Sequence, residues 1–265
     1  MKKLITPALL LSFSLLISGV TVAAPSAEEI IQKSNLAAVY PGNDGRAEAR
    51  MMIVDKQGRK QVRQFSILRR NIEKGGDQQY LVVFTRPADV ERTTFLVVKH
   101  PGKEDDRWLY LPGLDLVKRI AAGDKRTSFV GSNFFYEDIS GRDIRQDSFE
   151  LVSENTESWL VKATPKSTAG VEFSHYQVTI SKANHLPLKA EYFDSKGELY
   201  RRISAEAVSE ISGIPTITSM KAENVRDGSH TINQMRNIEY NINIPESVFT
   251  ERSLRTPPQQ WLEFK

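Results

Sequence analysis

The sequence predicts a mainly β protein with a few helices, in which a single, strongly curved antiparallel sheet forms an incomplete, half-open β-barrel. Two observations and one general property of large sheets predict it. About a dozen short segments have the residue pattern of strands, and turn-forming residues separate most of them. One clear amphipathic helix lies near the N-terminus, and helices do not alternate with strands as they would around a parallel sheet. A sheet of this many strands is expected to curl around its own apolar face.

The first 23 residues are expected to be a signal peptide that is removed from the mature protein. Lys2 and Lys3 give a positive start, residues 4–20 are mostly apolar, and the small residues that follow favour cleavage after Ala23. The chain has no cysteine, so neither lipidation at the cleavage site nor disulfide formation is expected. We therefore expect an exported, unlipidated protein of the bacterial periplasm.

Residues 24–265 are expected to form one domain, because neither a linker nor an internal repeat divides them. The domain begins with a helix over residues 26–39. Ser26 can cap this helix, and Glu28 and Glu29 lie in its first turn, where the helix dipole favours acids. Its apolar stripe consists of Ile30, Ile31, Leu36 and Val39.

Strands are expected on both sides of a longer irregular segment. Residues 194–198 and 226–229 have the composition of hairpin turns and join strands of similar length, which favours antiparallel meanders. The last residues, 256–264, are expected to be a docking tail or a frayed end. The expected strands cover residues 46–54, 59–72, 80–84, 93–99, 107–111, 149–153, 158–162, 173–181, 187–193, 199–207, 216–225 and 231–240.

Residues 112–141 interrupt the succession of strands. A structureless loop of this length is uncommon in a compact domain, and its many aromatic and aliphatic side chains argue against disorder. Leu114, Val117 and Ile120 lie three residues apart, which favours a short helix. We expect the segment to cover or enter the concave face of the sheet as an apolar flap, or else to complete the core as an ordinary plug.

The sequence contains no recognisable motif for catalysis, cofactor binding or metal binding. The histidines occur in no metal-binding spacing, and neither a nucleophile elbow nor a phosphate-binding loop is present. Glu137 and Asp138 are the best candidates for acid–base chemistry, as in an envelope hydrolase, but the sequence favours a protein that is not an enzyme. The net charge of +3 over 265 residues is too small to indicate nucleic-acid binding.

Several stretches between residues 107 and 138 resemble one family signature. They are RWLYLPGL at 107–114, VKRI at 117–120, SFVGSNF at 128–134 and YED at 136–138. This pattern resembles the outer-membrane lipoprotein-sorting-like proteins, relatives of the periplasmic lipoprotein carrier LolA. Gly113, Asp115 and Asn133 depart from the usual pattern, while its aromatic and apolar frame is retained.

The resemblance implies a half-open barrel with helices over its mouth and a hydrophobic cavity between them. It also implies that the protein binds a lipid or the acyl group of a lipoprotein and moves it between membranes. Association with an inner-membrane exporter of the resistance-nodulation-division type, and with an outer-membrane acceptor, would follow. An alternative remains open, in which the protein is a periplasmic accessory subunit that stays docked on such an exporter or envelope complex. We expect a monomer.

The candidate ligand-binding side chains lie on the flap or on the strands next to it. Alternate side chains of a strand point to opposite faces, and the sequence does not say which face lines the cavity. Basic side chains near the mouth are expected to meet anionic headgroups or an acidic docking surface. The candidates for ligand contact are Phe84, Phe95, Trp108, Tyr110, Leu114, Val117, Phe129, Phe134 and Phe135. The basic candidates are Arg107, Lys118, Arg119 and Arg126.

Overall fold

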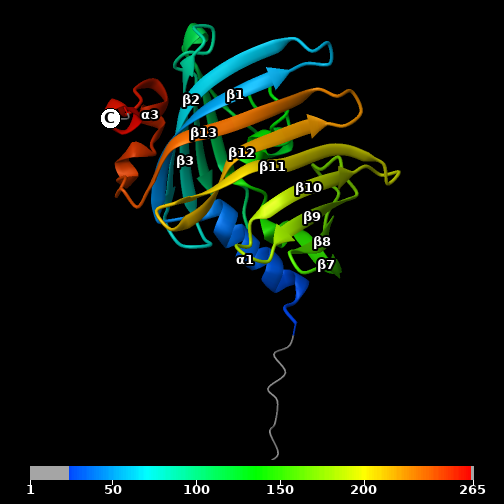
Figure 1. Ribbon diagram of the computed structural model, residues 1–265. Coiled ribbons are helices and arrows are strands. Elements are labelled where there is room, and N and C mark those ends of the chain that lie inside the picture. The colour runs from blue at the N-terminus through cyan, green and yellow to red at the C-terminus, as the bar shows by residue number, and fades with distance from the viewer. Residues whose placement is uncertain (1–23, 264–265) are drawn as a thin grey trace, which may run out of the picture.

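The computed structural model describes residues 24–263 (Figure 1), and the signal peptide expected for residues 1–23 lies outside them. The strands before residue 120 are β1 (Asp44–Val54), β2 (Lys60–Asn71), β3 (Gln78–Arg86), β4 (Thr94–Lys99), β5 (Asp106–Leu111) and β6 (Leu116–Arg119). The later strands are β7 (Asp147–Glu154), β8 (Ser158–Pro165), β9 (His175–Ser181), β10 (Pro187–Phe193), β11 (Leu199–Ile211), β12 (Ile214–Asn224) and β13 (His230–Tyr240). The α-helices are α1 (Ala27–Val39), α2 (Tyr136–Ser140), α3 (Glu251–Arg255) and α4 (Gln259–Leu262).

All thirteen strands belong to one antiparallel sheet, in the order β6-β5-β4-β3-β2-β1-β13-β12-β11-β10-β9-β8-β7. Two meanders, β1–β6 and β7–β13, are joined where β1 pairs with β13. The sheet curves strongly (Figure 1) but does not close, because β6 and β7 remain as its two edges. The predicted half-open barrel is confirmed. All the expected strands are present, and β6 is an additional one.

Helix α1 begins and ends where the sequence predicts. The Ser26 hydroxyl accepts a hydrogen bond from the Glu29 amide at 3.2 Å, and the Glu29 carboxylate accepts one from the Ser26 amide at 2.8 Å. This capping box satisfies amides that the first turn leaves free. The buried side of the helix, with Ile30 and Ile31, packs onto a cluster from β8, β9 and β10 that includes Trp159. Helix α1 therefore covers the second meander. No helix of residues 24–263 is long and apolar enough to cross a membrane.

Strands β2 to β5 are buried on both faces, which explains the continuous apolar run at 80–84. Tyr80, Val82 and Phe84 point into the concave side, while Leu81 and Val83 pack against the C-terminal segment on the outer side. Burial on both faces removes the usual alternation of polar and apolar residues. Figure 1 shows α3 and the C-terminal end on the outer side of the sheet, and α3 contacts β4 and β5. The described part of the C-terminal tail is therefore packed on the sheet, and it is not a frayed end.

The segment between β5 and β7 enters the curve of the sheet. The helix expected across residues 114–120 is wrong: Leu116–Arg119 forms the edge strand β6, in which Val117 pairs with Tyr110 of β5. Asp115 has a φ of 45°, so it makes a turn and not a helix. Pairing with the open edge of β5 satisfies backbone groups that a single helical turn would leave exposed. Beyond β6, the side chains of Phe129, Phe134 and Tyr136 complete the core on the concave side.

Candidate functional site

A cavity of about 380 Å³ lies inside the curve of the sheet. Strands β1, β2, β3, β10, β11, β12 and β13 form one side of it, and the C-terminal end of α1 together with α2 forms the other. On β1 the cavity is lined by two small residues, Gly45 and Ala47. A Cβ atom at position 45 would lie only 2.8 Å from the Glu239 carbonyl oxygen, so this close approach of β1 and β13 requires glycine.

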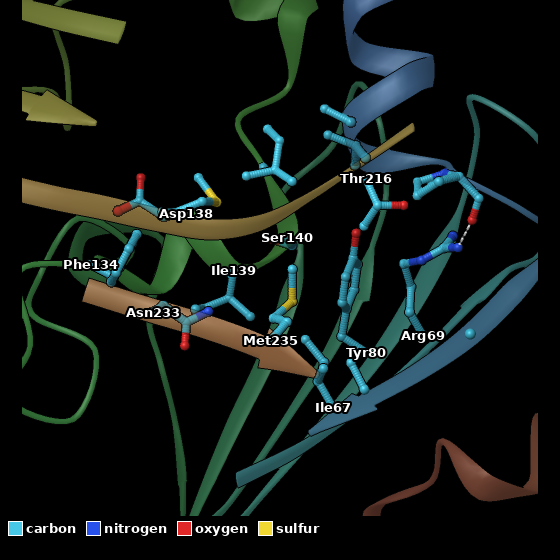
Figure 2. Close-up of a pocket in the computed structure, with 18 of the residues that line it drawn as sticks. Ile67, Arg69, Tyr80, Phe134, Asp138, Ile139, Ser140, Thr216, Asn233 and Met235 are labelled. Carbon is cyan, nitrogen blue, oxygen red and sulfur yellow. Dashed lines mark hydrogen bonds between the residues drawn. The ribbon is translucent and has the colours of Figure 1, made fainter. Parts of the chain in front are cut away.

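The two ends of this cavity differ in chemistry. Figure 2 shows Arg69 and Tyr80 at one end, Phe134 and Asn233 at the other, and Met235 between them. Most of the lining between the ends is apolar. The Oδ1 atom of Asn233 is buried and has no hydrogen-bond partner among the described residues. The cavity is thus a mainly apolar space with a few polar groups at its ends, which is typical of small-molecule binding sites.

Polar side chains at the Arg69 end hold the C-terminal end of α1 on the sheet. The amide nitrogen Nε2 of Gln78 donates to the Val39 carbonyl at 2.7 Å. Arg69 donates to the Pro41 carbonyl through Nη2 and to Oδ1 of Asn71 at 2.5 Å through Nη1. The last carbonyls of a helix lack partners within the helix. These bonds supply such partners at the end of α1 and in the turn after it, and they involve no carboxylate.

Helix α2 is fastened at the other end by buried ion pairs. The Glu137 carboxylate lies 2.7 Å from Arg126, 3.3 Å from Arg142 and 3.7 Å from Lys125. Burial raises the pKa of Glu137, but Arg126 and Arg142 outweigh that effect and hold the pKa below its ordinary value. A general acid or base works best with a pKa near the operating pH. The arrangement of Glu137 therefore suits anchoring and not proton transfer.

Asp138, the second carboxylate considered for chemistry, is occupied in the same way. It forms an ion pair with Arg201, whose side chain is buried between Phe135 and Tyr192. It also accepts a hydrogen bond from the Phe135 amide at 2.6 Å, so it caps α2. No group of three or more metal-ligating side chains that could hold a metal ion occurs within residues 24–263.

Comparison with known proteins identifies the family. A family model described as "Uncharacterized protein" matches residues 76–256. The crystal structure of a DUF1329 family protein from Desulfovibrio piger is 30% identical in sequence, with a TM-score of 0.79, and the match covers 88% of this chain and 100% of that chain. The chain belongs to the DUF1329 family. No curated protein matches its sequence.

Two further structures relate this DUF1329 chain to LolA-like proteins. A domain from Vibrio parahaemolyticus, named for outer membrane lipoprotein sorting, is 26% identical with a TM-score of 0.79, and the match covers 87% of this chain and 98% of that one. A LolA superfamily protein from Nitrosomonas europaea is 16% identical with a TM-score of 0.66, and the match covers 86% and 99%. The second likeness shows a shared fold alone. The resemblance inferred from residues 107–138 is confirmed.

Of the aromatic residues that the sequence suggested for ligand contact, Phe134 lines the cavity. Phe84, Phe95 and Phe129 do not line it, because they fill a fully buried cluster beside it. The ring centroid of Phe129 lies 5.8 Å from that of Phe84 and 5.4 Å from that of Phe95. Such packing uses these rings to attach the flap to the sheet. In this DUF1329 chain the flap therefore acts partly as a plug that completes the core.

The other candidates for ligand contact lie outside the cavity. Trp108, Tyr110 and Val117 point to the outer face of the sheet, where they pack with the C-terminal segment. The alternation along β5 places their neighbour Leu109 on the concave side instead. Phe135 is half-buried, with its ring 5.0 Å from the Arg126 guanidinium. Leu114 is 73% exposed. None of these five candidates is among the lining residues.

The basic candidates divide into two groups. Arg107 and Arg126 are buried in ion pairs, Arg107 with Asp105 at 2.5 Å, so they are not available to a headgroup. Lys118 and Arg119 are exposed on the edge strand β6. The sequence suggested one basic patch because it does not show that the nearby Asp105 folds against Arg107, or that Glu137 and Glu172 fold against Arg126.

Sequence reasoning missed the half of the cavity that comes from the last three strands and from α1. The sequence carries only a weak signal for this part of the lining: single apolar residues recur within otherwise polar strands. The missed lining residues on these strands include Ile203, Ile217, Met220, Met235 and Ile238. They are only partly buried, as expected for side chains that face an unfilled space.

Proposed function

We propose that this protein is a periplasmic carrier that binds a lipid, or the acyl group of a lipoprotein, in the cavity and moves it between membranes. The observation that supports this most is the cavity itself, about 380 Å³ and mainly apolar, between a curved sheet and two helices. Sites for small ligands have volumes of about 300–1,000 Å³. The likeness to a Vibrio domain named for lipoprotein sorting supports the same role.

A carrier is needed because acyl chains do not cross water readily. Exposing each methylene costs about 0.8 kcal/mol, so a lipid with long chains leaves a membrane very slowly without cover. Met220, Met235 and Ile217 offer partly buried apolar surface for such a chain. Methionine suits a site that accepts chains of differing shape, since its side chain is flexible and polarisable.

We propose that the ligand enters beside the C-terminal end of α1. Helix α2 is fastened by buried ion pairs around Glu137, whereas the end of α1 is held by neutral acceptors such as the carbonyl groups of Val39 and Pro41. Water can replace these contacts. Displacing this end of α1 therefore costs less free energy than displacing α2. Opening there would leave the aromatic core around Phe129 intact.

A docking surface is proposed at the tip that joins β5 to β6. Leu114 and Leu116 are exposed large apolar residues, and Lys118 and Arg119 follow them on the edge strand. This combination suits contact with an anionic membrane surface, or with an exporter or acceptor in it. A subunit that stays docked on such a partner would use the same surface, so the alternative role is tested together with the carrier.

The test is mass spectrometry of lipid extracted from the protein after purification from periplasm without detergent. The expected result is an acylated species in stoichiometric amount. A protein that is empty, and that also fails to take up the apolar fluorescent probe N-phenyl-1-naphthylamine, would refute the carrier. An empty protein that co-purifies persistently with a membrane partner would favour the docked accessory role.

A further inference from the structure

The arginines that line the cavity among the described residues differ in their partners. Arg46 pairs with Glu239 at 2.9 Å, and Arg142 pairs with Asp147 at 2.8 Å. Arg69 is 8% exposed, and no carboxylate of residues 24–263 forms an ion pair with it. A buried cation is normally paired with an anion, because removing a charge from water without compensation is strongly unfavourable.

The partners that Arg69 does have are neutral. Its guanidinium donates to the Asn71 side-chain oxygen and to the Pro41 carbonyl, which lies just beyond the end of α1. A helix C-terminus carries a partial negative charge, which compensates a guanidinium less than a carboxylate would. Burial lowers the pKa of Arg69, and Tyr80, Tyr240 and the Asp44 carboxylate, which forms no ion pair with it, oppose that shift only in part. Geometry and charge therefore agree that this group lacks a full countercharge.

The space beside Arg69 continues into the apolar part of the cavity. Gly45 lies opposite Arg69 in the pairing of β1 with β2, and both residues line the cavity. Figure 2 shows Ile67 and Met235 between Arg69 and Phe134, which lies at the far end. From Arg69 the lining thus passes through a run of apolar side chains before it reaches the polar groups Asn233 and Asp138 near Phe134, which matches a molecule with one charged head and one apolar chain.

We propose that the cavity binds an amphiphile whose single anionic headgroup, a carboxylate or a phosphate, pairs with Arg69 while its chain extends toward Phe134. The guanidinium is suited to this because its planar N–H groups match two oxygens of such a headgroup. The inference rests on the proposed carrier function and names the class of cargo. It assigns the headgroup to one end of the cavity.

The experiment measures displacement of N-phenyl-1-naphthylamine by three probes: laurate, dodecanol of the same chain length, and inorganic phosphate. The proteins are the wild type, Arg69→Met, Arg69→Lys and the matched control Arg70→Met. Arg70 is the neighbouring residue of β2; it points away from the cavity and lies 3.5 Å from Glu246. Thermal unfolding of each variant is recorded to verify that it is folded.

The wild type is expected to bind laurate at least about tenfold more tightly than dodecanol. Arg69→Met should lose that preference while dodecanol binding stays within about threefold, Arg69→Lys should keep part of the preference, and Arg70→Met should keep all of it. Equal binding of laurate and dodecanol by the wild type, or a preference that survives in Arg69→Met, would overturn the inference and leave the carrier standing. Phosphate that binds as tightly as laurate would also overturn it, because the site would then be one for a free anion.

Failure of the wild type to bind the reporter and both amphiphiles would refute the carrier function itself. If Arg69→Met does not fold, the comparison of laurate with dodecanol in the wild type and in Arg69→Lys still decides the question.

Discussion

The carboxylate of Glu137 lies 2.7 Å from the guanidinium of Arg126, and both side chains are almost completely buried. Arg126 belongs to the loop that enters the curve of the sheet, and Glu137 belongs to α2. Arg126 also reaches Glu172, in the turn before β9, at 2.7 Å. The pair therefore links the cover of the cavity to the second meander of the sheet.

Glu137→Gln is expected to lower the free energy of unfolding by about 3–5 kcal/mol, because Arg126 and Arg142 would lose a buried countercharge. Urea denaturation measures this change. The matched control is Glu104→Gln, which removes an exposed carboxylate 3.7 Å from Lys125 and should change stability by less than about 1 kcal/mol. Equal effects of the two substitutions would contradict the anchoring role of Glu137.

Stability should depend on pH through Lys99. Burial lowers the pKa of Lys99 to about 8 from its ordinary value of 10.5, against the opposing effect of Asp105. Between these two pH values the unfolded chain holds a proton that the folded chain has lost, so stability rises with pH across this window. The unfolding free energy of the wild type minus that of Lys99→Met should therefore increase from pH 8 toward pH 10.5. A difference that stays constant over this range would be evidence against the shifted pKa.

A charge placed in the middle of the cavity should abolish binding of an apolar ligand. Met235→Glu puts a carboxylate into the apolar lining and is expected to weaken binding of N-phenyl-1-naphthylamine by at least about tenfold. The control, Val208→Glu, introduces the same charge on β11 at a side chain that is 42% exposed and outside the lining, and it should leave binding unchanged. Fluorescence titration compares the two, and similar losses in both would argue against this cavity as the binding site.

Phe129 should matter for stability more than for ligand contact. It is fully buried against Phe84, Phe95 and Tyr136, so Phe129→Ala is expected to destabilise the fold by about 3–5 kcal/mol. Phe135→Ala removes a half-buried ring stacked on guanidinium groups and should cost about 1–2 kcal/mol. Urea denaturation ranks the two variants. The reverse order would show that Phe129 does not fasten the flap.

Reversing the charge of the proposed docking tip should affect membrane contact and not folding. Lys118→Glu combined with Arg119→Glu is expected to reduce binding to vesicles containing anionic lipid, with stability lowered by no more than about 1 kcal/mol, because only the exposed ion pair of Arg119 with Asp106 is lost. The matched control reverses Lys56 and Lys60, which are exposed at the turn between β1 and β2. Co-sedimentation with vesicles is the measurement, and equal losses in both double variants would mean that net charge alone is responsible.

The local pattern of the sequence was sufficient to predict the strands and α1. Ser26 and Glu29 make the capping box that marks the helix start, and hairpin turns such as 194–198 separate strands at the expected places. The edge strands of the sheet, and the face to which each side chain points, were harder to predict. The apolar residues Leu114, Val117 and Ile120 lie three positions apart, and this spacing predicted a helix. Leu116–Arg119 instead forms a strand because it pairs with the free edge of β5, and a local spacing pattern does not reveal such pairing.

The cavity could not be predicted from the sequence, because it forms between segments from opposite ends of the described chain. Met51 of β1 lies next to Asn233 of β13 only because the two meanders pair. The role of Arg126 also depends on the fold. The sequence places it in a basic patch, whereas the structure pairs it with Glu137 and Glu172. Aromatic side chains near the flap looked like ligand contacts, but large rings pack most favourably in a filled core, and the open space remains where smaller and more flexible side chains line it.

The two unpaired edges, β6 and β7, have a mechanical consequence. A closed barrel has a circumference fixed by its strand number and stagger, whereas a sheet with free edges can flatten or tighten while every ladder between neighbouring strands stays intact. The space enclosed by this sheet can therefore widen or narrow without the loss of a ladder, as the proposed carrier would require for ligands of different size. Residues 120–146 connect the two edge strands, β6 and β7. The length of this connection limits how far the edges can separate.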